Sequence, residues 1–368
     1  MERQASVEPL TSMRELLQQT VFVVGEDAYC WADVALASIV WGDWDRLRQE
    51  VREGMASLRA VRESGRPMPE AEIAEAAADF RYERELISAQ EAEAWFARWG
   101  LSAGAWMEFI RRSVIRSKHQ SRLSEWLSGY PVDDADVAAA MGTEAVCSGL
   151  LTRLAPKFAA RAAVYARMHA ARENGHPLFS DEELAGAMPP PPAALRAQGL
   201  HLDEAYLAAR STRIAEIELA LRAFRGEVVT PKAVGEQIAA HHLEWIRVGY
   251  QTLIYPAESM VREALLCVRE DGMALSDLAA ESDAAELRDE EHWIGEVTGP
   301  LHASLLGALP GEVLGPFSTT GGHALLRITS KRLPTVDDEQ VRSRAEMAAL
   351  RRALANELQT RVQWITEL

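Results

Sequence analysis

Few residues of the chain combine the types and the spacing that metal binding or catalysis requires. His241, His242 and Glu244 offer two imidazoles and a carboxylate, which are common zinc ligands. Adjacent residues on a helix point about 100° apart, so the two imidazoles do not face one ion. The acidic groups within 133–136 and 289–291 would hold a divalent cation only if their carboxylates converged, and we expect solvated loops there. We therefore expect no metal and no cofactor.

A basic cluster stands out in an otherwise acidic chain. It consists of five side chains in the segment IRRSVIRSKHQSR, namely Arg111, Arg112, Arg116, Lys118 and Arg122. One interpretation is a surface that pairs with the carboxylates of an acidic peptide. The other is a solvated helix face whose charges pair within the protein.

Aromatic residues gather near the N-terminus, because seven of the ten tryptophans lie in the first 126 residues. Trp95 and Trp99 are four residues apart and would share one face of a helix. Such a stripe is typical of a buried core, which is the expected role here. An aromatic groove for a peptide is the alternative.

Composition excludes several classes of protein. Of 368 residues, 48% are hydrophobic and 26% are charged, as in folded globular proteins. The formal net charge of −16 argues against nucleic acid or an anionic membrane as a partner. Three cysteines more than a hundred residues apart form no CxxC pair, and the start of the chain shows no export signal. We expect a cytoplasmic protein with reduced thiols.

The pattern of elements predicts an α+β fold. Ala, Leu, Glu and Arg dominate the first 240 residues, where apolar positions recur three or four apart, which predicts helices. Four prolines at 189–192 predict an extended spacer. Strands are expected at 245–255 and 323–331, with helices at 257–270 and 274–281 between them and a last helix over 335–364.

The most specific segment spans residues 309–328 and reads LPGEVLGPFSTTGGHALLRI. It resembles the last third of a parvulin-type peptidyl-prolyl isomerase domain, which carries a G-E-V-x-G-P turn, a Thr-containing loop, a G-[YF]-H element and a final strand. The matching residues are Gly311, Glu312, Val313, Gly315, Pro316, Thr319 and Gly322. The segments YQTLI and MALSDLAAES resemble earlier parts of that domain, and Trp293 resembles the aromatic of its G-G-x-[LI]-G-[WF] motif. The resemblance covers about residues 246–332.

Departures from the parvulin pattern bear on activity. Members of that family place two facing histidines beneath the substrate proline, and the corresponding positions here are Thr252 and Ala324. His323 is displaced by one residue, which turns its side chain to the opposite face of a strand. Val297 and Leu301 stand where the family commonly has Met and Phe. The resemblance therefore implies a degenerate domain that keeps a groove without efficient prolyl rotation.

The layout of the chain resembles that of SurA-type chaperones, with a parvulin-like domain between a helical region and a returning helix. A second similarity is to the parvulin-related peptide maturation system proteins that accompany ribosomally made peptides, such as those of the crocagin pathway. It rests on the segments AAADFRYERELISAQEAEAWFARWGLSAGAWMEFIRRSVIR and VRSRAEMAALRRALANELQTRVQWI. The resemblance implies a helical region over 1–240, a degenerate parvulin-like domain over 241–334 and a C-terminal helix over 335–368 that packs on the helical region.

The resulting hypothesis is a non-catalytic protein that binds a ribosomal precursor peptide and presents it to tailoring enzymes of the same pathway. The peptide would pair with an open sheet edge and insert apolar side chains into a groove. The candidate residues are Thr252, Trp293, Val297, Leu301, Phe317 and His323, together with Arg111, Arg112 and Arg116 of the basic cluster. The alternatives are a peptidyl-prolyl isomerase with an unusual site and a general holdase chaperone. The sequence leaves monomer and dimer equally open.

Overall fold

The computed structural model describes residues 13–65, 68–171 and 178–366, which form two compact units. The helical unit comprises residues 1–224 and 354–368, and the sheet unit comprises residues 225–353. The chain passes into the sheet unit within α12 (Glu204–Val228) and leaves it within α17 (Glu339–Arg361). The division therefore falls inside two helices and not at residues 240 and 334. Residues 1–12, which make up most of the segment where no export signal is expected, lie outside the described residues.

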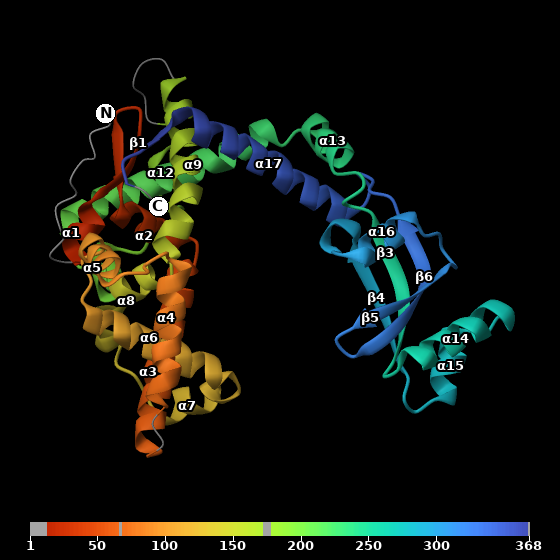
Figure 1. Ribbon diagram of the computed structural model, residues 1–368. Helices are drawn as coiled ribbons and strands as arrows, with labels where there is room; N and C mark the ends of the chain where they lie inside the picture. Colours follow the sequence, from red (N-terminus) through yellow and green to blue (C-terminus); the bar gives the residue numbers. More distant parts are fainter. Residues whose placement is uncertain (1–12, 66–67, 172–177, 367–368) are drawn as a thin grey trace. The chain divides into compact units, whose positions relative to one another are not determined.

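The helical unit, whose helices are labelled in Figure 1, is built around α2 (Trp31–Val40). The residues of α2 from Trp31 to Ile39 are all buried. A helix that is apolar on every side is stable only when other elements surround it. Here α9 (Leu150–Ala170) and α3 (Asp43–Glu63) pack against it. The remaining helices of this unit are α1 (Met13–Gln18), α4 (Glu70–Glu83), α5 (Ala89–Arg98), α6 (Ala103–Lys118), η1 (Gln120–Arg122), α7 (Leu123–Gly129), α8 (Asp134–Cys147), α10 (Asp181–Ala185) and α11 (Pro192–Ala197).

A small sheet in the helical unit was not predicted. Strands β1 (Thr20–Val24) and β2 (Asp27–Cys30) form a hairpin, and β7 (Val362–Trp364) pairs with the other edge of β1. Phe22 stacks on Tyr29 at 5.0 Å between ring centroids and meets Trp364 edge-on at 5.5 Å. The last helix therefore ends at Arg361, because the next three residues gain strand partners more than 300 positions away.

The two strands and two helices predicted between residues 245 and 331 are confirmed in their order, whereas two further strands and two further short helices among them were not predicted. Strand β3 (Arg247–Tyr255) is followed by α14 (Glu258–Glu270), α15 (Leu275–Glu281), β4 (Glu286–Trp293), η2 (Ile294–Glu296), α16 (Pro300–Gly307), β5 (Val313–Thr319) and β6 (Gly322–Arg332), and α13 (Pro231–Ala240) precedes them. The four strands form an antiparallel sheet in the order β4-β3-β6-β5. The solvated loop expected at 289–291 is wrong, because these residues belong to β4. The α+β class is confirmed.

The two faces of this sheet carry separate apolar cores. On one face, alternate residues of β3 and β6, among them Val248 and Ile328, pack with Ile294 of η2 and Leu305 of α16. On the other face, residues such as Leu253 pack with α14 and α15. Side chains alternate along a strand, so the register decides which residues reach the α16 face.

The proline segment is shorter as a spacer than predicted. Pro191 is extended, with φ −61° and ψ 155°, but α11 begins at Pro192. Proline suits the first position of a helix because its missing N–H would have no helical partner there. No helix within 13–65, 68–171 or 178–366 has the length and apolar character needed to cross a bilayer.

Candidate peptide-binding site

The α16 face of the sheet brings together four of the predicted residues. Val297, Leu301 and Phe317 are partly buried and pack against the core of this face. Thr252 lies on β3 opposite Leu326, which belongs to the same core. We call the surface formed by Thr252, Val297, Leu301 and Phe317 the cradle. Its apolar members come from the residue after η2, from α16 and from β5, and its hydroxyl comes from β3, so the fold assembles it from segments up to 65 residues apart.

A polar group lies beside the cradle, along β3 and β4. Thr252 is 6% exposed, and its hydroxyl donates to the carboxylate of Glu290 at 2.7 Å. The register places Tyr250 opposite Glu290, and burial, with the nearby Glu290 charge second, raises the pKa of Tyr250 to about 12. His292 stacks on Tyr250 at 5.8 Å. A buried hydroxyl thus holds a carboxylate at the edge of an apolar surface.

Glu290, Tyr250 and His292 were missed as site residues. No alternation of apolar and polar residues in ELRDEEHW could have found them, because Asp289 and Glu291, at the intervening positions, are charged as well. The pairing of β4 with β3 places these side chains, and the sequence does not display that pairing. In the structure, β4 pairs with β3 alone among the described strands, so its outer edge is open.

The register turns His323 away from the cradle, as its displacement by one residue predicts, so the expectation that His323 contacts a peptide in this groove is wrong. His323 pairs with Tyr255 on β3 and Ser318 on β5, whereas Ala324 pairs with Ile254 and Phe317. Ala324 belongs to the core of the α16 face and is fully buried. Thr252 and Ala324 therefore occupy the α16 face at the two positions where the resembled isomerases carry histidine.

The expectation that Trp293 lies in the same groove is wrong. Trp293 packs with Trp245, Val341 and Ala345, which form a separate cluster between the start of the sheet and α17. The guanidinium groups of Arg247 and Arg344 lie 5.2 and 4.5 Å from its ring centroid. These cation–π contacts and the apolar packing give Trp293 a structural role in holding α17 within the sheet unit.

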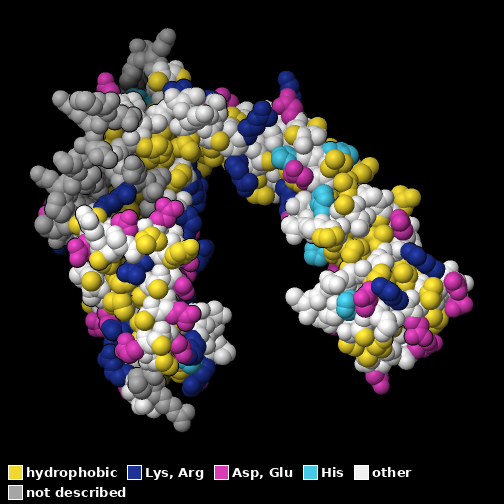
Figure 2. Space-filling view, viewed as in Figure 1, with side chains coloured by type: hydrophobic (Ala, Val, Ile, Leu, Met, Phe, Trp, Pro, Cys, Tyr) yellow, Lys and Arg dark blue, Asp and Glu magenta, His cyan; other side chains and the backbone are white. Residues whose placement is uncertain are grey.

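Every side chain of the basic cluster is already paired inside the helical unit. Arg112 bonds Glu144 at 2.6 Å, Arg116 meets Glu50 at 3.0 Å and Lys118 meets Glu72 at 2.6 Å. Arg111 and Arg122 pair with acidic residues three positions away on the same segment. Figure 2 shows the same intermingling, with dark blue and magenta side chains next to one another over this unit. Arg112 is buried, so its expected role in binding a peptide is wrong.

The aromatic stripe belongs to the core, as expected. Trp99 is 5% exposed and its ring lies 5.2 Å from that of the fully buried Trp31. Trp95 is partly buried and meets Phe80 edge-on at 5.6 Å. Burial of these rings stabilises the junction of α2, α4 and α5 and leaves no open aromatic groove at this stripe.

The histidine pair also has a local explanation. His241 Nδ1 lies 2.8 Å from the Glu244 carboxylate, and its ring stacks on Trp245 at 4.8 Å. Within the part of the chain that the structure describes, no three residues among His, Cys, Asp and Glu converge as metal ligands would. This arrangement is a surface hydrogen bond at the end of α13.

Comparison with protein-family models finds no match, and comparison with curated proteins finds none. Solved structures similar to this chain include PrsA from Bacillus subtilis, with a TM-score of 0.21 and 15% identity over 55% of this chain and 81% of that one. The peptidylprolyl isomerase (PrsA) of Bacillus cereus has a TM-score of 0.30 and 14% identity over 58% of this chain and 86% of that one. The peptidylprolyl isomerase (PrsA) of Bacillus anthracis has a TM-score of 0.26 and 15% identity over 54% of this chain and 93% of that one. These scores are too low to establish a shared arrangement of whole chains.

Proposed function

We propose that this protein binds an extended peptide on the cradle of the sheet unit without breaking or forming a covalent bond. We further propose that the natural peptide is a ribosomal precursor, which the protein presents to tailoring enzymes. The observation that carries the proposal is the partly exposed apolar surface of Val297, Leu301 and Phe317 beside the Thr252–Glu290 pair and the open edge of β4. An apolar surface with a few fixed polar groups is typical of peptide and small-ligand sites.

The spacing of these groups defines the peptide they fit. Phe317 lies on β5 and Glu290 on β4, three strand spacings or about 14 Å apart across the sheet. The register places Phe317 level with Glu286, so Glu290 is offset by four further residues, or about 13 Å, along the strand, and the two positions are about 19 Å apart. Six residues of extended chain span about 20 Å. An apolar side chain, such as proline, would therefore contact Phe317 and Leu301, while a Lys or Arg about six residues away reaches Glu290. The backbone beyond it can pair with the open edge of β4.

The charge of this edge favours a cationic segment of the peptide. Five of the eight residues of β4 are charged, and four of those are acidic. Charged side chains deter an edge strand from pairing with another apolar strand. They attract a strand that carries Lys or Arg, so they add selectivity. The paired basic cluster of the helical unit has no part in this proposal.

Absence of bond chemistry is supported by the residues at the centre of the cradle. Thr252 uses its hydroxyl to hold Glu290, and Ala324 offers only a methyl group. Neither side chain supplies the imidazole pair of the resembled isomerases. We therefore expect the rate of X-Pro isomerisation in a protease-coupled assay to rise less than twofold at equimolar protein. A clear acceleration that Thr252→Val abolishes would favour the isomerase alternative.

Fluorescence anisotropy tests binding directly. The neighbouring genes are searched for a short precursor peptide, which serves as the labelled probe, and its scrambled version is the control. Leu301→Ala removes apolar contact from the cradle, and Leu266→Ala is the matched control because Leu266 is 55% exposed on α14, across the sheet. We expect Leu301→Ala to weaken binding about tenfold, from the loss of roughly 1.5 kcal/mol of apolar contact. The control should bind like the parent protein.

Two outcomes would replace the proposal. Equal affinity for scrambled and natural peptides, together with broad suppression of aggregation, would indicate a general holdase.

Presentation is tested separately, by adding the protein to a tailoring enzyme at peptide concentrations below its KM. Tethering raises the local concentration of substrate, so we expect a faster reaction with the parent protein than with Leu301→Ala. No difference between them would refute presentation.

A further inference from the structure

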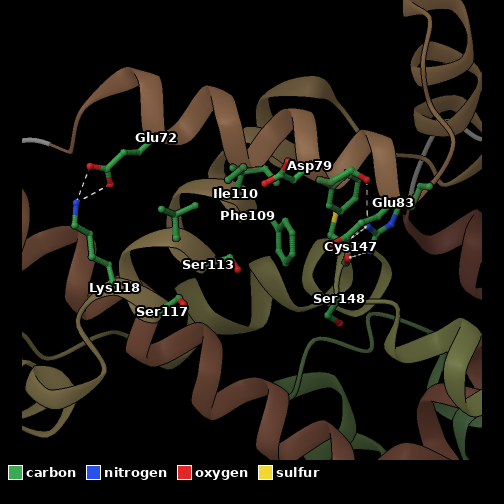
Figure 3. Close-up of a pocket in the computed structure, with 14 residues that line it drawn as sticks. Glu72, Asp79, Glu83, Phe109, Ile110, Ser113, Ser117, Lys118, Cys147 and Ser148 are labelled. Carbon is green, nitrogen blue, oxygen red and sulfur yellow. Dashed lines mark hydrogen bonds and ion pairs between the residues drawn. The ribbon is translucent and has the colours of Figure 1, made fainter. Parts of the chain in front are cut away.

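The helical unit contains a groove that shares no residue with the cradle. It runs between α4 and α6, has a volume of about 740 Å³ and ends near Cys147 and Ser148 at the junction of α8 and α9 (Figure 3). Its lining residues on α4 and on α6 recur three or four apart, so each helix contributes one continuous face. This groove belongs to the helical unit alone and is independent of the cradle.

The floor of the groove is apolar and the two ends are closed by charge. Phe80, Ile110 and Cys147 are buried at the bottom. At one end Lys118 of α6 bonds both carboxylate oxygens of Glu72 on α4, at 2.6 and 2.7 Å. Figure 3 shows this pair bridging the two helices.

The other end is fixed by Arg84. Its guanidinium lies 3.7 Å from the Phe80 ring centroid and donates to the carbonyl oxygen of Cys147 at 2.9 Å. It also pairs with Glu83 at 3.6 Å. From Glu72 to Glu83, α4 rises about 16 Å, or about three helical turns, so the open stretch between the closed ends has a defined length.

The open stretch presents one free charge. Asp79 of α4 is exposed and, among the described residues that line the groove, is the one carboxylate without an ion-pair partner. Across from it, α6 presents the small exposed side chains of Ser113 and Ser117 above the partly buried Phe109 and Val114. The groove is therefore wide on the α6 side and negative on the α4 side.

We propose that the α4–α6 groove binds an amphipathic helix of about three turns that carries Lys or Arg along one edge of its apolar face. The walls are helices whose backbone amides and carbonyls are bonded internally, so an extended peptide would find no backbone partners there. A helix satisfies its own backbone and places apolar side chains at i, i+4 and i+7 onto the floor. A cation on the edge of the bound helix pairs with Asp79, and the protein's net charge of −16 also favours a positively charged helix.

The test uses a capped 15-residue peptide with Leu on one helical face and Lys on both flanks, labelled for anisotropy. Two control peptides have Glu in place of Lys or the same residues scrambled. Ser113→Trp fills the groove, and Ala74→Trp, on the far side of α4, is its matched control. Asp79→Asn removes the free charge, with Glu93→Gln on α5 as the control outside the groove. Thermal melts check that each variant is folded.

We expect the Leu/Lys peptide to bind at least tenfold more tightly than either control peptide and to gain helical circular dichroism on binding. Ser113→Trp should weaken binding at least tenfold and Asp79→Asn about two- to fivefold, the range of one solvent-exposed ion pair. The control variants should change it less than twofold. Binding of the scrambled peptide with equal affinity, or an undiminished affinity in Ser113→Trp, would overturn the proposal. Leu301→Ala should leave this binding unchanged, so the result is separate from that for the cradle.

Discussion

The ion pair between Arg112 and Glu144 offers the sharpest test of whether the basic cluster is structural. Arg112 Nε donates to Glu144 Oε1 at 2.6 Å, and the two side chains are 10% and 8% exposed. Replacing Arg112 with Met leaves the carboxylate buried without its cation. Loss of one partner of a buried pair costs about 3–5 kcal/mol of unfolding free energy, because the remaining charge is uncompensated. We expect Arg112→Met to lose stability in this range at pH 7.

The stability lost in Arg112→Met should depend on pH if its cause is the unpaired Glu144 carboxylate, and not if its cause is a packing defect alone. Burial raises the pKa of Glu144, and the neighbouring Arg112 charge lowers it, with burial the larger effect. An acid whose pKa is raised on folding loses stability as pH rises through that pKa, and recovers it as pH falls. Without Arg112 the pKa of Glu144 rises further. The stability lost in Arg112→Met should therefore be smaller at pH 5 than at pH 7.

Urea unfolding followed by circular dichroism measures both effects. The matched control is Arg111→Met, whose partner Glu108 is exposed, and its expected cost is below about 1 kcal/mol. The double variant Arg112→Met/Glu144→Gln should regain most of the lost stability, because it removes the unpaired charge. A cost below 1 kcal/mol for Arg112→Met, or a cost equal at both pH values, would refute the structural assignment.

Three further predictions concern the sheet unit. Trp293→Ala should lower the free energy of unfolding by about 2–3 kcal/mol, since the ring packs with Trp245 and α17, and the folded variant should bind the peptide normally by anisotropy. Thr252→Val should reduce stability by about 1 kcal/mol in urea unfolding, because its hydroxyl no longer bonds the Glu290 carboxylate. The pKa of Tyr250 is raised to about 12, so Tyr250 stays neutral in the folded protein at a pH where the tyrosine of the unfolded chain, with a pKa near 10, has ionised. The free energy of unfolding should therefore fall between pH 10 and pH 12, and it should fall less steeply in Tyr250→Phe, as urea unfolding at each pH would show.

Sequence predicted the sheet unit best where local pattern and tertiary structure agree. β3 and β6 are rich in β-branched and apolar residues because both faces of the central strands are buried. The displacement of His323 from the cradle also followed from sequence, since side chains alternate along a strand and a shift of one position changes the face.

The failures have physical causes that the sequence alone does not display. β4 is rich in charged residues and has no strong strand propensity, so its structure depends on pairing with β3. Trp293, the last residue of that strand, packs in a cluster with residues of α17, about 50 residues later in the chain. The basic cluster depends on partners such as Glu72 and Glu144, which only folding brings near. Long-range partners decided all three outcomes.

The decisive measurement for a peptide site on the cradle is titration of the labelled precursor peptide into the parent protein, Leu301→Ala and Leu266→Ala. We expect saturable binding that is stronger than for the scrambled peptide, about tenfold weaker in Leu301→Ala and unchanged in Leu266→Ala. Equal affinity of all three proteins, or no preference over the scrambled peptide, would contradict a peptide site on the cradle.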